Sequence, residues 1–313
     1  MGKSVATIRL RPVLLKGALV AAIPVLLMTA SGAVASFPGK NGDIAISRTT
    51  KGQSDIWLID TKSGDTTRLT STPKRNEGMP DWNADGVTIA YSRCGRDELS
   101  NCDIWIMDAD GSDGSRLTKT SDVQETWPTW SPDGTMIAYV SNAEDIAMDI
   151  WVMNADGSGQ TNLTPNTEDF DAFPEWSPDG SKLVFSSNVD NPDDTDDIWL
   201  MNPDGTGRTR LTASIRIDER PDWSPDGARI SFTRNGNVLT MDPDGDNKTK
   251  LMKTPGWEAA PTFSPNGKRI AYMRPNKKGR YGIWTMRTDG GHHRQLTSGK
   301  FDAFPDWQPL DSP

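Results

Sequence analysis

Hydrophobic and polar residues alternate with a period of two in short runs along most of the chain. The runs are rich in Ile, Val, Tyr, Phe and Trp, as in IAYSR from Ile89 and IAYVS from Ile137. This pattern predicts half-buried β-strands, and the Asp-Gly and Asn-Gly steps between the runs predict tight hairpin turns. No helical period of useful length follows residue 35, so we expect an all-β protein.

The strands belong to one unit that is repeated six times. Each unit is marked by a string of the type Pro-x-Trp-Ser-Pro-Asp-Gly, followed by an apolar strand, a strand of the type Asp-Ile-Trp and a leucine near a final turn. The string reads PDWNADG from Pro80, PTWSPDG from Pro128, PEWSPDG from Pro174, PDWSPDG from Pro221, PTFSPNG from Pro261 and PDWQPL from Pro305. The leucines recur every 40 to 48 residues, so each unit has room for four short strands.

Four-stranded sheets of this size bury both faces when they stack around a common axis, and six of them form a six-bladed β-propeller. The first unit lacks a Pro-x-Trp strand, whereas the last such strand has nothing after it. We therefore expect residues 304–309 to supply the innermost strand of the first blade and to close the ring.

The first 35 residues differ from the repeats. Four basic side chains precede an apolar run from Ala18 to Ala30, and an Ala-x-Ala sequence ends at Ala35. This order is typical of a secretory signal peptide, so we assign residues 1–35 to the signal and residues 36–313 to the propeller. The alternative is a transmembrane anchor, but the apolar run is shorter than the ~20 residues that cross a bilayer. We expect a secreted or periplasmic protein with no membrane span after cleavage.

Charge and residue usage exclude several functions. The first 35 residues hold four basic and no acidic side chains, so the remainder carries a net charge of −13 rather than the −9 of the whole chain. Such a surface repels phosphate backbones, and we expect no nucleic-acid partner. The only histidines are His292 and His293, which excludes sites built from several histidines. No nucleophile motif or phosphate-binding glycine loop occurs, so we predict no catalytic residue.

The motifs PxWSPDG, IAY and DIWxMD together resemble the repeat of the TolB-type propellers, a WD-like family of exported bacterial proteins. The resemblance covers residues 37–309 and implies a six-bladed propeller. TolB itself carries an α/β domain before its propeller, and that domain helps it to meet its partners. We expect the propeller alone in this chain, because few residues separate Ala35 from the first repeat at Gly42.

Cys94 and Cys102 are the only cysteines, and they fall within one loop of the second repeat. In an oxidising compartment such a pair closes as a local disulfide. A zinc site would need two more ligands, and the segment offers only carboxylates. We therefore predict a disulfide.

The loops of one face of the ring carry the candidate binding residues. The loop that leads into each Pro-x-Trp strand, which we call the leading loop, opens on the same side as the loop between the second and third strands. Variable loops on a rigid scaffold are common binding sites. Six aromatic residues of the leading loops are candidates for stacking on a sugar or gripping a peptide, the alternative being that they pack the loops together. They are Trp127, Phe170, Phe173, Trp257, Phe301 and Phe304.

An acidic residue stands three positions before the proline of every Pro-x-Trp strand. Radial symmetry would place these six carboxylates around the mouth of the central channel, where they repel one another unless they are paired. Two interpretations stay open: each carboxylate caps a turn or ties its blade to the next, or the ring binds a hard cation such as Ca²⁺. The residues are Glu77, Glu125, Asp171, Asp218, Glu258 and Asp302.

Two function classes fit these features. The first is an exported, non-catalytic and monomeric propeller that binds a protein, peptide or glycan partner through its loop-rich face, with or without a cation at the channel mouth. The alternative is a metal-assisted lyase or hydrolase that uses the channel carboxylates. Without a histidine on that face, an enzyme would rely on carboxylates, lysine or tyrosine for proton transfer, which favours the binding function.

Overall fold

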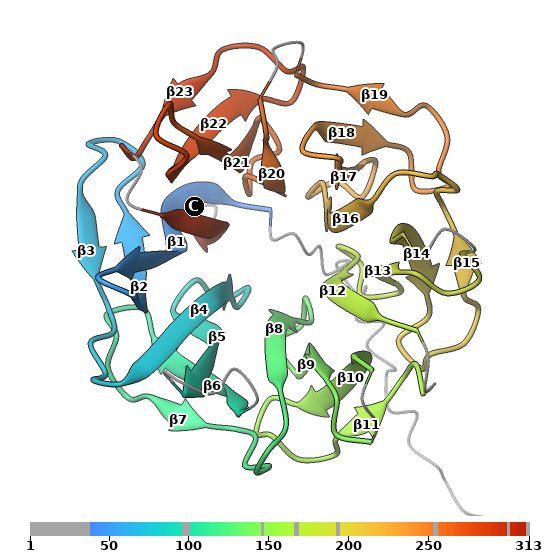
Figure 1. Ribbon diagram of the computed structural model, residues 1–313, viewed down its shortest axis with the longest axis horizontal. Helices are drawn as coiled ribbons and strands as arrows, with labels where there is room; N and C mark the ends of the chain where they lie inside the picture. Colours follow the sequence, from blue (N-terminus) through green and yellow to red (C-terminus); the bar gives the residue numbers. More distant parts are fainter. Residues whose placement is uncertain are drawn as a thin grey trace, which may run out of the picture. The chain divides into compact units, whose positions relative to one another are not determined.

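The computed structural model describes residues 38–310 except for short gaps at residues 96–100, 145–146, 166–168, 192–194, 253–255 and 299–300. Within the compact unit Gly32–Pro313, six four-stranded antiparallel sheets stand around a central axis (Figure 1). The predicted six-bladed propeller is therefore confirmed. In the described residues no helix is long and apolar enough to cross a membrane. The signal peptide assigned to residues 1–35 lies outside the described residues and stays a prediction.

The blades are numbered in chain order, and the strands of each blade follow one another from the channel to the rim. Blade 1 contains β24 (Asp302–Leu310), β1 (Lys40–Thr50), β2 (Gln53–Ile59) and β3 (Thr66–Arg68). Blade 2 contains β4 (Arg75–Trp82), β5 (Thr88–Gly95), β6 (Cys102–Asp108) and β7 (Ser115–Arg116). Blade 3 contains β8 (Glu125–Trp130), β9 (Met136–Ser141), β10 (Asp149–Asn154) and β11 (Thr161–Asn162). Blade 4 contains β12 (Asp171–Trp176), β13 (Leu183–Ser187), β14 (Asp197–Met201) and β15 (Thr209–Arg210). Blade 5 contains β16 (Asp218–Trp223), β17 (Ile230–Arg234), β18 (Val238–Met241) and β19 (Thr249–Lys250). Blade 6 contains β20 (Ala259–Phe263), β21 (Arg269–Pro275), β22 (Tyr281–Arg287) and β23 (Arg294–Gln295).

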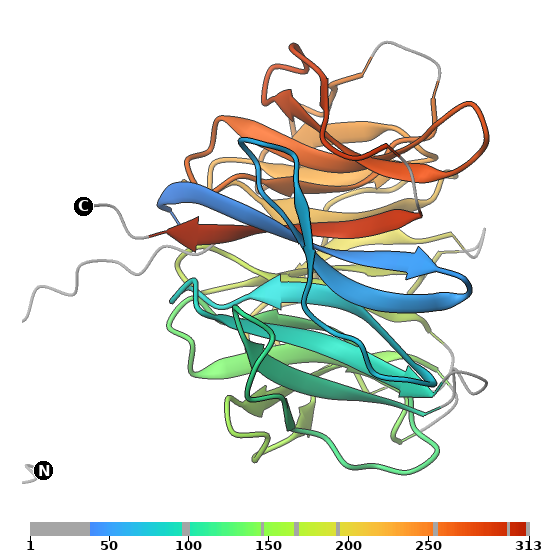
Figure 2. The same ribbon diagram turned by 90° about the vertical axis from the view of Figure 1, so that its left-hand side faces the viewer.

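Strands from opposite ends of the sequence close the ring in blade 1. β24 pairs antiparallel with β1, with Trp307 opposite Ile44 and Asp302 opposite Arg48. Figure 2 shows these two strands side by side. The predicted closure by residues 304–309 is thus confirmed, and the strand extends a few residues further than predicted.

The repeated tryptophans pack between neighbouring blades. Trp82, Trp130 and Trp176 of the innermost strands are at most 5 % exposed, and each belongs to an apolar cluster that joins two sheets. Large aromatic side chains fill the wedge between two splayed sheets and bury much apolar surface there. The repeat therefore encodes the contact between blades as well as the strands.

A β-bulge interrupts every innermost strand at its proline. Proline has no amide hydrogen to donate to the ladder, and one extra residue is inserted there, between Gly78 and Asp81 in blade 2 for example. The residue before each proline has a left-handed φ of 48 to 56°. We call these six residues the collar: Met79, Trp127, Phe173, Arg220, Ala260 and Phe304.

Candidate binding site in the central channel

The residue between the proline and the aromatic residue of each repeat lines the central channel. These six side chains surround a cavity of about 40 Å³: Asp81, Thr129, Glu175, Asp222, Thr262 and Asp306. We call the four acidic ones, Asp81, Glu175, Asp222 and Asp306, the channel carboxylates. They were not predicted, although a signal was present in the sequence, since the variable position of Pro-x-Trp is acidic in four of six copies.

Each channel carboxylate accepts a hydrogen bond from an adjacent blade. Asp306 of blade 1 accepts one of 2.7 Å from the Trp82 amide of blade 2, and Asp81 of blade 2 accepts one of 2.7 Å from the Trp130 amide of blade 3. The two remaining bonds join Asp222 to the Phe263 amide at 2.6 Å and Glu175 to the Thr129 hydroxyl at 2.9 Å. These bonds fix the carboxylates in place and tie neighbouring blades together along the channel.

Burial raises the pKa of all four channel carboxylates. It raises the pKa of Asp306 to about 7, although hydrogen bonds from the Trp82 and Trp307 amides act in the opposite direction. Burial is also the largest cause of the raised pKa of Asp81, Glu175 and Asp222, and nearby negative charges raise each pKa further. A positive charge placed in the channel would lower these pKa values and favour the ionised carboxylates.

The collar surrounds the mouth of the channel, directly next to the channel carboxylates. A cavity of about 90 Å³ is bordered by the collar, by the six prolines that follow it and by the channel wall. The rings of Trp127 and Phe173 meet edge to face, with their centroids 4.6 Å apart. The Arg220 guanidinium lies 4.5 Å from the centre of the Phe173 ring and 5.0 Å from that of Phe304. Cation–π contacts of this kind hold the arginine between two phenyl rings.

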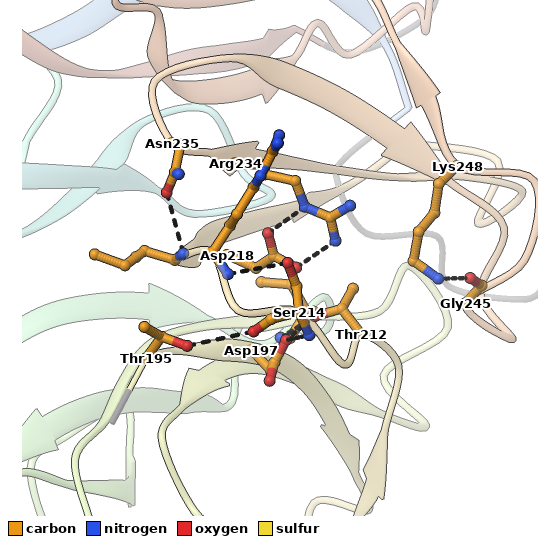
Figure 3. Close-up of polar contacts among 12 residues, drawn as sticks. Thr195, Asp197, Thr212, Ser214, Asp218, Arg234, Asn235, Gly245 and Lys248 are labelled. Atoms are coloured by element: carbon orange, nitrogen blue, oxygen red, sulfur yellow. Dashed lines mark hydrogen bonds and ion pairs between the residues drawn. The ribbon is translucent and has the colours of Figure 1, made fainter. Parts of the chain in front are cut away.

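The six acidic residues predicted at the channel mouth are buried inside their own blades, and none borders either channel cavity. Each is at most 1 % exposed. Figure 3 shows the arrangement in blade 5, where Arg234 Nε lies 2.6 Å from Asp218 Oδ1. Four of the six form such an ion pair with an arginine of the facing strand: Glu77 with Arg93, Asp218 with Arg234, Glu258 with Arg274 and Asp302 with Arg48.

The two acidic residues that form no ion pair with an arginine in the described part of the chain lie in blades 3 and 4. Glu125 faces Ser141 and Asp171 faces Ser187 across the first two strands. Burial raises the pKa of both carboxyls, and hydrogen bonds from serine and threonine hydroxyls oppose it. Across the described ranges, no three His, Cys, Asp or Glu side chains are grouped so that they could hold a metal ion. These contacts favour the scaffold interpretation of the acidic residues, and calcium binding stays a prediction.

The sequence matches the TolB beta propeller domain family over residues 28–169 and 92–312, which together span most of the chain. The chain belongs to this family. Similar solved structures include TolB from Acinetobacter baumannii, with 21% identity over 88% of this chain and 69% of that chain and a TM-score of 0.72. A putative TolB from Agrobacterium tumefaciens has 20% identity over 87% of this chain and 92% of that chain, with a TM-score of 0.65. Hydrazine synthase from Kuenenia stuttgartiensis has 16% identity over 87% of this chain and 47% of that chain, with a TM-score of 0.70. At these identities the likeness shows the fold alone, and no curated protein matches the sequence.

In this TolB-type propeller, three of the six aromatic candidates meet at the channel. Trp127, Phe173 and Phe304 belong to the collar, whereas Phe170, Trp257 and Phe301 border neither channel cavity. These last three side chains are 37 to 48 % exposed. Trp257 lies over the turn at Gly236 and meets Tyr281 edge to face, with ring centroids 5.9 Å apart. The other collar residues were not predicted, because the position before the proline has no common residue type.

The predicted disulfide between Cys94 and Cys102 is present in this TolB-type propeller. The cysteines face each other on β5 and β6 rather than within the loop, so the bond closes the base of the hairpin. The Cys102 amide also donates a 3.1 Å hydrogen bond to the Val123 carbonyl in the leading loop of blade 3. The disulfide therefore lies on the face of the leading loops, which is also the face of the collar.

Proposed function

We propose that this propeller is an exported binding protein that holds a segment of a protein or peptide partner at the collar, with a positively charged group of that partner in the channel. The observation that carries the proposal is that the collar, with its aromatic residues Trp127, Phe173 and Phe304, lies directly next to the four channel carboxylates. A rigid ring of blades holds both, so the site is formed before the partner arrives.

The size of the cavity favours insertion of one side chain. Its volume of about 90 Å³ is well below the 300–1,000 Å³ of pockets that enclose a whole small ligand. A single side chain fits, while the rest of the partner contacts the outer surface of the ring. Trp127 and Phe304 offer the flat apolar surface that dominates the binding energy of many protein interfaces.

The charge of the channel favours a cationic end on that side chain. A lysine, an arginine or an amino terminus would lie beside Asp306 and its neighbours, whose pKa values are raised chiefly by burial and, at Asp222, also by the Asp306 and Asp81 carboxylates. Binding would ionise these carboxyls, so the propeller should release protons to the solvent when the partner binds near neutral pH.

The proposal is tested by selecting peptides from a displayed random library on the folded protein and measuring the affinity of the enriched sequences. We expect the enriched peptides to share a lysine or arginine next to an apolar residue. Trp127→Ala should weaken binding at least tenfold, whereas Phe301→Ala, an exposed aromatic outside the channel, should leave it within twofold. Equal binding by Trp127→Ala and the native protein would exclude the collar as the site.

Export is supported by the signal-like sequence of residues 1–35 and by the disulfide, which is stable in oxidising compartments. Cell fractionation with N-terminal sequencing of the mature protein tests this part. We expect a chain that begins at Ser36 outside the cytoplasm, and an uncleaved chain would contradict the signal assignment.

A second candidate function, a lyase or hydrolase, is favoured by one observation. A carboxyl group with a pKa of about 7, as at Asp306, is suited to general acid–base catalysis near neutral pH. Assays on peptides and acidic polysaccharides, with Asp306→Asn as the matched variant, test this alternative. Turnover that Asp306→Asn retains in full would exclude a catalytic role for this carboxyl.

A further inference from the structure

Basic side chains gather on blade 6, at the face opposite the collar. Lys268, Arg269 and Arg287 border a cavity of about 480 Å³ at the Asn266-Gly267 turn and the adjacent Asp-Gly turn. These turns lie at the other ends of the strands from the leading loops. The cluster stands out because the propeller carries a net charge of −13 from residue 36 onward.

The two arginines face each other across β21 and β22, in register. The equivalent positions in blade 5 hold an ion pair, with Arg229 Nη1 2.7 Å from Asp242 Oδ1. In blade 4 the corresponding Lys182 donates a 2.6 Å hydrogen bond to Asn202 Oδ1. Blade 6 is thus the blade in which a basic residue at this position faces a second positive charge. Like charges directly opposite on paired strands destabilise a sheet unless an anion compensates them.

Arg269 also carries a buried donor without an acceptor. Its Nη1 atom is shielded from solvent and makes no hydrogen bond within the described residues. A buried guanidinium donor left without a partner costs free energy, and such exceptions in folded proteins call for a ligand, an ion or a water. Asp289 is the one acidic residue at the rim of the cavity, and the described residues contain no ion pair between it and these bases.

A second cavity extends the site toward blade 1. It has a volume of about 120 Å³, and Arg269 borders it together with Arg294 of β23. Arg294 is held in place because it donates hydrogen bonds of 3.0 and 3.1 Å to the Thr61 and Lys62 carbonyls of blade 1. Arg269 therefore lies between two cavities, each with a further arginine on its wall.

We propose that this cluster, formed by Lys268, Arg269 and Arg287, binds a phosphate group. Two guanidinium groups and an ammonium group match the several charged oxygens of a phosphate, and the planar guanidinium binds two of these oxygens at once. The neutral donors of Asn266 and Thr288 at the same cavity can satisfy the remaining oxygens. The phosphate can be a free anion or the phosphate ester of a lipid headgroup. This site is independent of the proposed function at the collar, with which it shares no residue.

Calorimetric titration of the folded protein with inorganic phosphate, at constant ionic strength in chloride, tests the proposal. We expect saturable binding that Arg287→Asp weakens at least tenfold. This substitution copies the Arg229–Asp242 pair of blade 5, so the variant should fold, and its unfolding midpoint should equal or exceed that of the native protein. The control is Arg216→Asp, which makes the same charge change at an exposed position in the leading loop of blade 5 and should leave phosphate affinity within twofold.

A flotation assay distinguishes the two sources of phosphate. Binding to phosphatidylglycerol vesicles but not to phosphatidylcholine vesicles, lost in Arg287→Asp, would assign the site to a lipid headgroup. Saturable binding of inorganic phosphate without vesicle binding would assign it to a soluble phosphate. The proposal is overturned if the native protein binds neither probe, or if Arg287→Asp and Arg216→Asp bind both as the native protein does.

Discussion

Replacement of Asp306 by asparagine should make the propeller more stable above neutral pH. The pKa of this carboxyl is raised from its ordinary value of 3.8 to about 7, chiefly by burial in the channel. Between pH 3.8 and about 7, the folded protein therefore keeps a proton that the unfolded chain has lost. The stabilisation that goes with this proton is fully present below pH 3.8 and is lost as the pH rises through about 7.

The magnitude follows from the distance between the two pKa values. Each pH unit corresponds to about 1.4 kcal/mol, so ionisation of Asp306 in the folded state costs up to ~4 kcal/mol relative to the unfolded chain. At pH 8, where the carboxyl is ionised in both the folded and the unfolded state, we expect Asp306→Asn to gain about 2–4 kcal/mol. At pH 5 the gain should fall to about 1–2 kcal/mol, because only the unfolded carboxyl is ionised there and asparagine accepts the Trp82 amide hydrogen bond as a protonated carboxyl does.

Urea unfolding of both proteins at pH 5 and pH 8 measures this difference. The control is Asp110→Asn, which removes a negative charge from an exposed turn where hydrogen bonds from Ser112 lower the pKa of the carboxyl. That variant should show no gain at pH 8. If the unfolding free energies of Asp306→Asn and of the native protein depend on pH in the same way, burial does not raise the pKa of Asp306.

The disulfide, the buried ion pairs and the unpaired acidic residues lead to three further predictions. Cys94→Ser should cost about 2–3 kcal/mol of unfolding free energy by urea titration, and a reductant should lower the stability of the native protein by the same amount. Arg234→Met should cost about 3–5 kcal/mol by urea titration, because it leaves Asp218 buried without its counter-charge; an unchanged midpoint would refute the ion pair. A calcium ion at the buried acidic residues would have to bind Glu125 or Asp171, which form no ion pair with an arginine among the described residues. Millimolar Ca²⁺ should then raise the thermal midpoint of the native protein but not that of Asp171→Asn. If Ca²⁺ changes neither midpoint, calcium binding at these residues is refuted.

The fold could be predicted from the sequence because its determinants are local and are repeated. Each Asp-Gly or Asn-Gly turn specifies a hairpin on its own, and six copies of the repeat leave few alternatives to a ring. The missing first Pro-x-Trp strand and the surplus one at Pro305 were enough to predict the closure by β24.

The channel wall was missed because the bulge at each proline changes which side chains share a face. In an unbroken strand, Glu77 and Asp81 are four residues apart and would share one face. The bulge between Gly78 and Asp81 inserts one residue, so the two side chains point to opposite faces. Glu77 therefore turns into the blade toward Arg93, and Asp81 turns into the channel.

The same bulge explains why only half of the aromatic candidates meet. Phe170 and Phe173 lie three residues apart in one loop, and residue type alone does not distinguish them. Phe173 lies directly before the proline, adopts a left-handed backbone and borders the channel mouth, whereas Phe170 does none of these. Phe301 and Phe304 both have a left-handed backbone, but only Phe304 lies directly before the proline and borders the channel mouth.

The pairing of β24 with β1 has a consequence for the order in which the protein can fold. Blades 2 to 6 are each made of consecutive strands, so each can form as soon as its own segment has been synthesised. Blade 1 must wait for the final strand, and its contacts carry the entropy cost of closing a loop that includes nearly the whole propeller. Until β24 arrives, β1 is an open sheet edge with unpaired amide and carbonyl groups, where another chain can pair. A chain truncated before residue 302 therefore keeps an open edge at β1, and the nine residues of β24 decide whether that edge closes the ring or pairs with another chain.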